Sequence, residues 1–402
     1  YGRVCASEAR SIVLLSPPGD PDTADLEVTD RVSLLHEHLE QSEAQPPVAV
    51  EFRRGRNVQA FWLEGPDGGK NRFPANFDAL VNDRNVGAIL AFAVMNSVFA
   101  EFLFEDWSGT FAPMLLPAGE WENQPYDKAR AGLKQFNLLG IITGTGPEAE
   151  ATYLPEPERT IRPGERLIVV PTEAPQESDV PGPVPDSVKV APARPGPVLV
   201  IGWSDASGAL ASELELTGTD PGVLHLLDLS APDPGQSGGQ VNLIEGDPSD
   251  PTDIAHAIQA LDPEIIWVSA EGTESTAIVR GMLARQVSDV PILVEQAHDD
   301  KTHRNERVAH GLTVVATGGI VAESVAFSLG DPAILVAREG MVNNPDVVLE
   351  SLTYTGSEPL ALSQLREAFA AGGAVPLAIL LEEGETHLQA GDHILAFHRT
   401  GS

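Results

Sequence analysis

Two short segments of this chain, 227 residues apart, follow the same pattern. Residues 162–173 read Arg-Pro-Gly-Glu-Arg-Leu-Ile-Val-Val-Pro-Thr-Glu, and residues 389–400 read Gln-Ala-Gly-Asp-His-Ile-Leu-Ala-Phe-His-Arg-Thr. In each segment a Gly-acid pair, Gly164-Glu165 or Gly391-Asp392, precedes a short apolar run. Such a run after a glycine turn is typical of a buried strand. The repeat predicts two similar blocks, each closed by one such strand.

The second block opens like a parallel α/β sheet. The apolar run Val198–Trp203 leads through a small polar loop into the helix-like segment Ala209–Leu216, and strands then alternate with helices up to residue 316. This alternation predicts parallel strands with right-handed crossovers. The first block contains only the later part of this plan, with strands at Ser11–Leu15 and Pro47–Phe52 and a helix at Thr29–Glu40. We therefore expect a first copy that is truncated at its N-terminus and has fewer parallel strands.

A proline-rich stretch separates the two blocks. Proline at this density is incompatible with helix or central strand, so we expect a semi-rigid spacer without regular structure. Residues 53–80 resemble an inserted hairpin or loop. Each block is expected to end in a small α+β lobe. The predicted division is 1–110 (partial first N-terminal lobe with a crossover helix), 111–171 (first C-terminal lobe), 172–196 (linker), 197–330 (second N-terminal lobe) and 331–402 (second C-terminal lobe).

The charge, the cysteine content and the length of the apolar runs exclude several kinds of partner and site. The 402 residues carry a net charge of −34, which disfavours nucleic acid as a partner. A single cysteine, Cys5, excludes an intrachain disulfide and a thiolate metal cluster. The longest uncharged apolar run, Asn85–Ala100, is shorter than the roughly 20 residues that span a bilayer.

The segment Asn85–Leu103 is predicted to be one long helix that is apolar on most of its circumference. A helix of this kind must be covered on every side. A subunit or a repeat partner is the natural cover, so we expect the chain to self-associate. The alternative is an ordinary core helix.

The loop at residues 202–208 (hereafter the Gly202 loop) stands where a dinucleotide-binding fingerprint would lie, between the first strand and the first helix. Gly202, Ser204, Gly208 and Asp228 are the candidate cofactor-binding residues, and Asp228 matches the acid that would meet a ribose. Serines replace the second and third glycines of the fingerprint, at positions 204 and 207. We therefore expect a structural loop, or a ligand other than NAD.

Acidic clusters offer candidate metal ligands. Hard cations such as Ca²⁺ take several carboxylate oxygens, which loops after strands can supply. The candidates are Asp20, Asp22, Asp25, Asp247 and Asp250, and a solvated surface is the alternative for each cluster. The chain contains no Gly-x-Ser-x-Gly, His-Glu-x-x-His or Walker motif, so we expect no enzyme.

Three segments together resemble tandem RCK domains (regulators of K⁺ conductance, TrkA-like), and most closely those of CASTOR/POLLUX-type ion channels and their bacterial relatives. Ala9–Leu15 is similar to the fourth strand of that family's first lobe. Val198–Trp203 resembles the Gly-Trp opening of its second lobe, and Ile320–Ser324 the start of its second crossover helix. The resemblance implies an α/β fold of Rossmann-like parallel sheets with small α+β C-terminal lobes, duplicated, with the first copy truncated.

The same resemblance implies a ligand-sensing gating ring at the cytoplasmic face of the membrane, controlling ion flow through a cation pore. The pore helices would lie upstream in the same polypeptide or on a partner subunit, and the ring would be a homo-oligomer of four chains. A soluble Trk-type nucleotide-sensing regulator of a potassium transporter would look similar, and a Rossmann-type enzyme is the third alternative. The substituted loop and the negative charge favour Ca²⁺ over NAD as the regulatory ligand.

Overall fold

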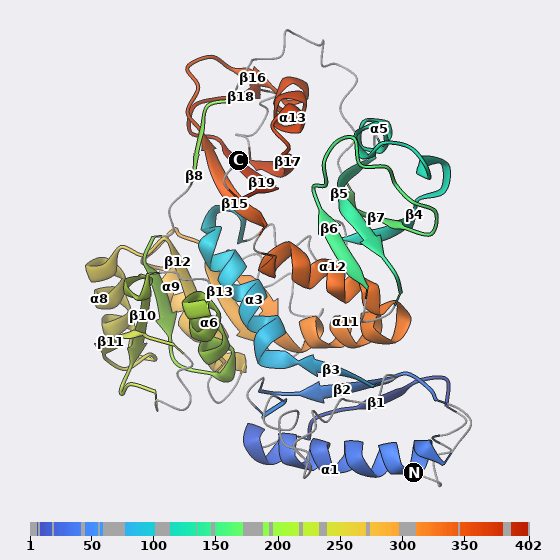
Figure 1. Cartoon of the computed structure of the whole chain (residues 1–402). Helices are drawn as coiled ribbons and strands as arrows, with labels where there is room; N and C mark the ends of the chain where they lie inside the picture. Colours follow the sequence, from blue (N-terminus) through green and yellow to red (C-terminus); the bar gives the residue numbers. More distant parts are fainter. Residues whose placement is uncertain are drawn as a thin grey trace. The chain divides into compact units, whose positions relative to one another are not determined.

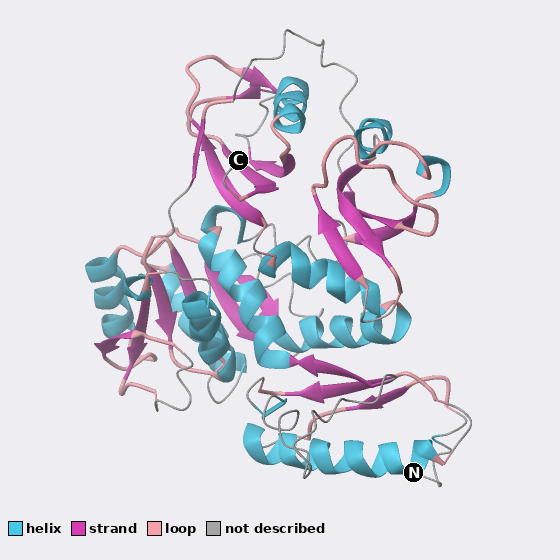
Figure 2. Cartoon of the chain, in the orientation of Figure 1, coloured by secondary structure: helices cyan, strands magenta, loops and turns pink. Residues whose placement is uncertain are grey.

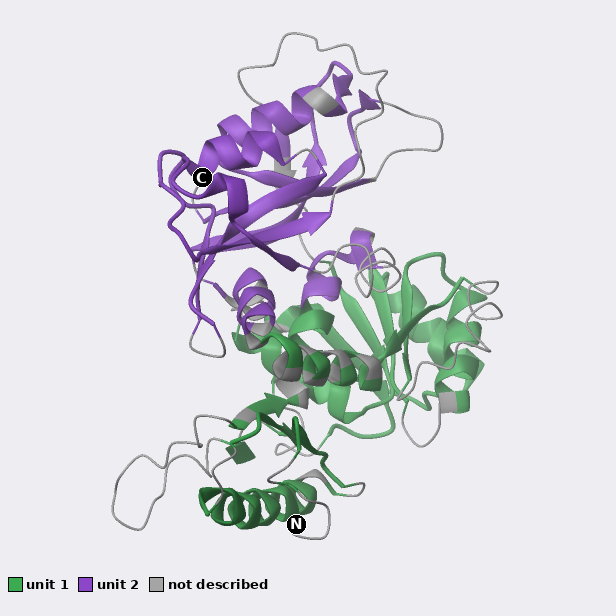
Figure 3. Ribbon diagram, turned by 90° about the vertical axis from the view of Figure 1, so that its right-hand side faces the viewer, with its two compact units in different colours: residues 1–91, 196–331 green, residues 92–195, 332–402 purple. Residues whose placement is uncertain are grey.

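The computed structural model divides into two compact units, residues 1–91 with 196–331 (unit 1) and residues 92–195 with 332–402 (unit 2) (Figure 3). The structure describes residues 6, 9–17, 20–41, 45–54, 57–58, 77–100, 113–133, 135–145, 149–171, 188–192, 196–216, 220–232, 239–270, 274–296, 311–344, 346–380 and 387–400. Among these residues, no helix combines the length and the apolar character that a bilayer span requires.

Unit 1 contains a small parallel sheet of β1 (Ile12–Leu14), β2 (Val48–Phe52) and β3 (Phe77–Val81), in that order (Figure 1). The helix α1 (Pro21–Glu40) connects β1 to β2 and buries one apolar side, with the sequence spacing of an amphipathic helix, at Val28, Val32, Leu35 and Leu39. α1 starts eight residues before the predicted Thr29. The reason is local, because Asp20 accepts a hydrogen bond from Thr23 N at 2.9 Å and Pro21 occupies the first turn.

The strand β3 corrects the interpretation of residues 53–80 as an inserted hairpin or loop. Residues 77–81 form an outer strand of the small sheet, where Val48 of β2 pairs with Phe77 and Phe52 pairs with Val81. The Gly-Pro-Asp-Gly-Gly segment at 65–69 lies outside the described residues.

The large sheet of unit 1 has six parallel strands in the order β11-β10-β9-β12-β13-β14, which confirms the predicted α/β class. Helices α8 and α9 pack on one face through a core that includes Ile254, Ile258 and Ala277, and α6 follows β9 (Figures 1 and 2). The bounds are β9 Val198–Ile201, α6 Asp205–Leu216, η6 Pro221–Val223, β10 Leu224–Asp228, β11 Asn242–Glu245, α8 Pro251–Leu261, β12 Ile265–Val268, α9 Glu274–Arg285, β13 Ile292–Gln296 and β14 Thr313–Ala316.

Each sheet is followed by a helix that packs on elements of the other sheet. After the large sheet, α11 (Thr317–Gly330) contacts β2 and β3 of the small sheet. After the small sheet, α3 (Asn82–Met95) approaches α6 so closely that a Cβ atom on Gly87 would lie 2.6 Å from the backbone oxygen of Ala209. The apolar helix α3 thus packs on a helix of its own chain, and the expected self-association stays a prediction.

The long helix predicted at Asn85–Leu103 is shorter than expected. α3 ends at Met95, because the side-chain amide of Asn96 donates to the Phe92 carbonyl oxygen at 2.9 Å and turns the chain. A 3₁₀ turn, η3 (Ser97–Phe99), follows, and residues 101–103 lie outside the described part of the chain.

Unit 2 contains two four-stranded antiparallel sheets, in the orders β4-β7-β5-β6 and β17-β19-β15-β8, and the pair β16-β18. The helix α12 and the strand β15 were not predicted. The bounds are β4 Met114–Pro117, η4 Gly119–Trp121, α5 Tyr126–Gly132, β5 Phe136–Thr143, β6 Glu150–Tyr153, β7 Arg166–Pro171, β8 Val190–Pro192, α12 Pro332–Asn343, β15 Val347–Tyr354, β16 Leu360–Ala361, α13 Leu362–Ala371, β17 Val375–Leu380, β18 His387–Leu388 and β19 His393–Arg399.

The two repeated segments adopt the same turn. Gly164 and Gly391 have positive φ angles of 83° and 109°. The carboxylate after each glycine accepts a hydrogen bond from the backbone three residues earlier, at 2.7 Å for Glu165 with Arg162 N and at 2.5 Å for Asp392 with Gln389 N. Each turn then leads into an inner strand of its sheet, β7 or β19.

The proline-rich spacer contains one element that we did not predict. Residues 190–192 form β8, which pairs antiparallel with β15 at the edge of its sheet, so the expectation of no regular structure is wrong there. An edge strand tolerates proline, because one side of the strand makes no ladder hydrogen bonds. Residues 172–187 and 193–195 lie outside the described residues.

Candidate functional site

The Gly202 loop lies at the point where the large sheet reverses its strand order. From β9 the chain proceeds to β10 on one side, and β12 pairs with the other side of β9. Ligands of open parallel sheets bind at such a point, beyond the carboxyl ends of the strands. Gly202 makes the turn with a φ of 75°, and its N–H donates to the Leu227 carbonyl oxygen at 3.1 Å. The predicted loop therefore occupies the expected place and needs its first glycine.

The side chains of Ser204 and Glu295 form a hydrogen bond beneath this loop. The Ser204 hydroxyl donates to Oε2 of Glu295 at 2.7 Å, and the Ala270 N–H donates to the same oxygen at 2.9 Å. Glu295 is in β13 and is only 8% exposed. Burial raises the pKa of its carboxyl, and the nearby charge of Asp205 acts in the same direction, although both hydrogen bonds oppose the change.

Ser207 takes the place of the third fingerprint glycine and uses its hydroxyl. The Ser207 hydroxyl lies 2.9 Å from that of Ser269 and accepts a hydrogen bond from Trp267 Nε1 at 3.1 Å. All three side chains are fully buried. Ser207 N also donates to Ser204 Oγ at 3.3 Å, so Ser204 caps α6. The two serines therefore bind the loop to the ends of β12 and β13.

The other two candidate cofactor residues occupy less central positions. Gly208 is buried within α6, where its N–H donates to the Ser204 carbonyl oxygen at 3.0 Å. Asp228 ends β10, and its carboxylate accepts a hydrogen bond from Leu229 N at 2.6 Å.

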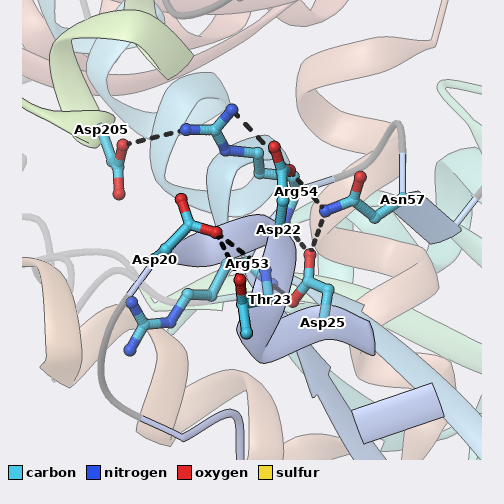
Figure 4. Close-up of polar contacts among 8 residues, drawn as sticks. All are labelled: Asp20, Asp22, Thr23, Asp25, Arg53, Arg54, Asn57 and Asp205. Carbon is cyan, nitrogen blue, oxygen red and sulfur yellow. Dashed lines mark hydrogen bonds and ion pairs between the residues drawn. The ribbon is translucent and has the colours of Figure 1, made fainter. Parts of the chain in front are cut away.

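The first acidic cluster surrounds the start of α1 (Figure 4). Asp25 is 1% exposed and accepts hydrogen bonds from Arg53 N at 2.8 Å, Arg54 N at 3.1 Å and the Asn57 side chain at 2.8 Å. Asn57 also donates to Asp22 at 3.0 Å. The Asp25 carboxylate thus fixes the backbone that leaves β2. Asp20 caps α1, and the hydrogen bonds from Thr23 lower the pKa of its carboxyl.

Arg54 connects this cluster to the Gly202 loop. Its guanidinium lies 3.9 Å from Asp22 and 3.6 Å from Asp205, the first residue of α6 (Figure 4). The Arg54 side chain is 16% exposed, and that of Asp205 is 71% exposed. The Arg54 guanidinium, which follows β2 of the small sheet, therefore faces the Asp205 carboxylate. Asp205 lies beyond the carboxyl end of β9, at the edge of the large sheet where ligands of open parallel sheets bind.

The second acidic cluster forms the turn between β11 and α8. Asp250 caps α8 and accepts a hydrogen bond from Thr252 N at 2.7 Å, which lowers the pKa of its carboxyl. Asp247 accepts a hydrogen bond from Ser249 N at 2.8 Å. Both carboxylates therefore have local structural roles.

Neither cluster supplies a ligand set by itself. Among the residues that the structure describes, no group of three or more histidine, cysteine, aspartate or glutamate side chains could hold a metal ion. The assignment of a metal to Asp20, Asp22, Asp25, Asp247 and Asp250 stays a prediction.

Two residues of this site, Glu295 and Arg54, were not identified from the sequence. Glu295 follows the apolar run Ile292–Val294, so an acid at the carboxyl end of a parallel strand was the available signal. Arg54 stands in the segment interpreted as an insertion, and its position after a strand end was the corresponding signal.

No protein-family model matches the chain, and a search of curated proteins finds no match. The fold is similar to that of the human SLO3 gating ring, with a TM-score of 0.66 at 12% identity over 100% of this chain and 89% of that chain. Alignments with the GsuK RCK domain and the GsuK channel bound to NAD cover 98% of this chain at 13% identity, with TM-scores of 0.42 and 0.43 and 79% and 66% of those chains. The chain thus has a mixed α/β fold with Rossmann-like parallel sheets, similar to the fold of the human SLO3 gating ring.

Proposed function

We propose that this chain is the ligand-sensing gating-ring part of a cation channel and that it is not an enzyme. The observation that carries the proposal is the similarity to the human SLO3 gating ring, which extends over the whole chain. We propose further that it belongs with the CASTOR/POLLUX-type channels, on the segments Ala9–Leu15, Val198–Trp203 and Ile320–Ser324.

The contacts within unit 1 suggest how a ligand would act. α3 packs on α6 and α11 packs on the small sheet, so the two sheets share their crossover helices. Arg54 adds a charge contact between them. A ligand that binds one arrangement of the sheets more tightly shifts the population toward that arrangement. In a ring, this shift would pull on the pore.

The partners follow from this role. The ring would consist of four copies at the cytoplasmic face of the membrane, below pore helices from the same polypeptide or from a partner subunit. The second candidate is a Trk-type regulator of a potassium transporter, which the Rossmann-like large sheet would also suit.

For the regulatory ligand we propose a divalent cation such as Ca²⁺ in preference to NAD. The Ser204 hydroxyl of the Gly202 loop is bound to Glu295, so it is not available to bind a pyrophosphate at this position. The net charge of −34 concentrates cations near the surface.

Ion flux into liposomes tests the proposal. The liposomes would contain the full polypeptide, or this chain together with its membrane partner, and K⁺ flux would be measured with Ca²⁺, with NAD and without ligand. We expect flux that responds to Ca²⁺ and an unchanged response to NAD. A response to NAD alone would favour the Trk-type regulator, and the absence of flux under all conditions would overturn the channel assignment.

A further inference from the structure

The buried carboxyl of Glu295 occupies the position in which an open parallel sheet normally receives its ligand. Glu295 extends from β13, while its partners Ser204 and Ala270 stand at the ends of β9 and β12. These two strands flank the reversal of the strand order. One oxygen, Oε2, accepts both hydrogen bonds.

One of the two donors that Glu295 uses, the Ser204 hydroxyl, stands where a bound phosphate would need a donor. Loops at this point bind phosphate with backbone N–H groups and hydroxyls at the start of the first helix. Here Ser207 N donates to Ser204 Oγ, and the Ser204 hydroxyl in turn donates to Glu295. The negative charge of the nearby Asp205 has the same sign as that of a phosphate, so it also disfavours an anionic ligand here.

We propose that Glu295 is the specificity-determining residue of the Gly202 loop, an internal carboxyl group that fills the phosphate site and excludes nucleotides from it. This inference deepens the proposed function, because it excludes a nucleotide from the Gly202 loop as the regulatory ligand. It does not require the chain to belong to a channel, because it concerns binding to this chain alone.

The serines support this interpretation. At the third fingerprint position, glycine permits close approach of helix and strand. Ser207 instead forms hydrogen bonds with Ser269 and Trp267, both fully buried. Helix α6 is therefore fixed to β12 by side chains, and Ser204 is held in the orientation that meets Glu295.

Calorimetric titration of the purified chain with inorganic pyrophosphate and with ADP tests the proposal. We expect at most weak binding by the wild type. Glu295→Ala removes the internal carboxyl group and should improve the affinity for pyrophosphate by at least about tenfold. Glu295→Gln is the matched control, because its amide oxygen can accept the same two hydrogen bonds and fill the same space, so the loop should stay closed.

Two results of the titration would each overturn the proposal. Wild-type binding of pyrophosphate that Glu295→Ala leaves unchanged would overturn the proposal, as would a folded Glu295→Ala variant that fails to bind. If that variant does not fold, Glu295→Ser replaces it. The short side chain also removes the carboxyl group, and a folded Glu295→Ser without any gain in binding would equally overturn the proposal. None of these results depends on the flux measurement, so either proposal can fail alone.

Discussion

The guanidinium of Arg54 lies 3.6 Å from the carboxylate of Asp205, and the two residues follow strands of different sheets of unit 1, β2 and β9. The backbone at Arg54 is held in position, because its N–H and that of Arg53 donate to the buried carboxylate of Asp25. Asp205 is placed by α6, whose first residue it is. The contact therefore joins two segments that are each fixed independently.

We predict a small but measurable coupling between Arg54 and Asp205. Because Asp205 is 71% exposed, solvent screens the pair, and a double-mutant cycle with Arg54→Gln and Asp205→Asn should give about 0.2–1 kcal/mol. Urea unfolding measures it. The coupling should also decrease in about 1 M salt. A coupling of zero at low salt would show that the contact does not stabilise unit 1.

A second prediction concerns the two repeated turns. Gly164→Ala and Gly391→Ala should each lower the free energy of unfolding by about 1–2 kcal/mol, because both glycines have a positive φ that alanine rarely adopts. No atom lies within 4 Å of the added Cβ at either position, so the backbone conformation is the only source of this cost. Gly372→Ala is the control, since Gly372 has a φ of −79° and should tolerate alanine. Equal effects at all three positions in thermal unfolding would contradict the prediction.

These turns illustrate what the sequence could predict. A glycine followed by an acid and an apolar run depends only on local backbone chemistry, so both turns and the strands β7 and β19 followed from the pattern. The large sheet was predictable for the same reason, because its buried strands are continuous apolar runs between polar loops. The sequence also placed the Gly202 loop correctly, between β9 and α6.

The remaining features depend on contacts between distant segments. Ser204 and Glu295 are 91 residues apart, and no local pattern pairs them. The strand β3 contains Asp78, which interrupts its apolar run, and only its pairing with β2 makes it a strand. α3 ends early because a single side-chain amide, that of Asn96, bonds to the helix backbone. These three features depend on particular side-chain and tertiary contacts, which the periodicity of the sequence does not reveal.

A third prediction concerns pH. In unit 2, Nε2 of His398 lies 2.5 Å from Oε1 of Glu350, and this hydrogen bond raises the pKa of His398 despite its partial burial. A raised pKa means that the folded state binds the proton more tightly than the unfolded state does. The stabilisation is therefore complete below about pH 6.5, the ordinary value, and is lost as the pH rises through the raised pKa.

The variant Glu350→Gln tests this prediction. The wild type should be more stable than the variant by on the order of 1 kcal/mol at about pH 5.5, and the difference should shrink at about pH 8.5. Urea unfolding at both pH values measures the difference. A gap that stays constant or widens as the pH rises would mean that Glu350 does not raise the pKa of His398.

The last prediction concerns Gly340 in α12, where two effects of opposite sign compete. Alanine in place of glycine within a helix contributes about 1 kcal/mol of stability. A Cβ on Gly340, however, would lie 2.7 Å from the ring and hydroxyl of Tyr153. The ring has little freedom to move, because Tyr153 is buried, its hydroxyl donates to the Ala337 carbonyl oxygen, and its edge meets Phe397 with a centroid distance of 5.5 Å.

Overpacking of this kind costs about 1–3 kcal/mol, so Gly340→Ala should lower the free energy of unfolding overall. The control is Gly330→Ala at the end of α11, where no atom lies within 4 Å of the added Cβ and alanine should be neutral or stabilising. Combining Gly340→Ala with Tyr153→Ala removes the ring and should restore the helix-propensity gain, so alanine at 340 would then stabilise the chain relative to Tyr153→Ala alone. If Gly340→Ala by itself raises the melting temperature, the Tyr153 ring has moved, and the contact between β6 and α12 is looser than these distances imply.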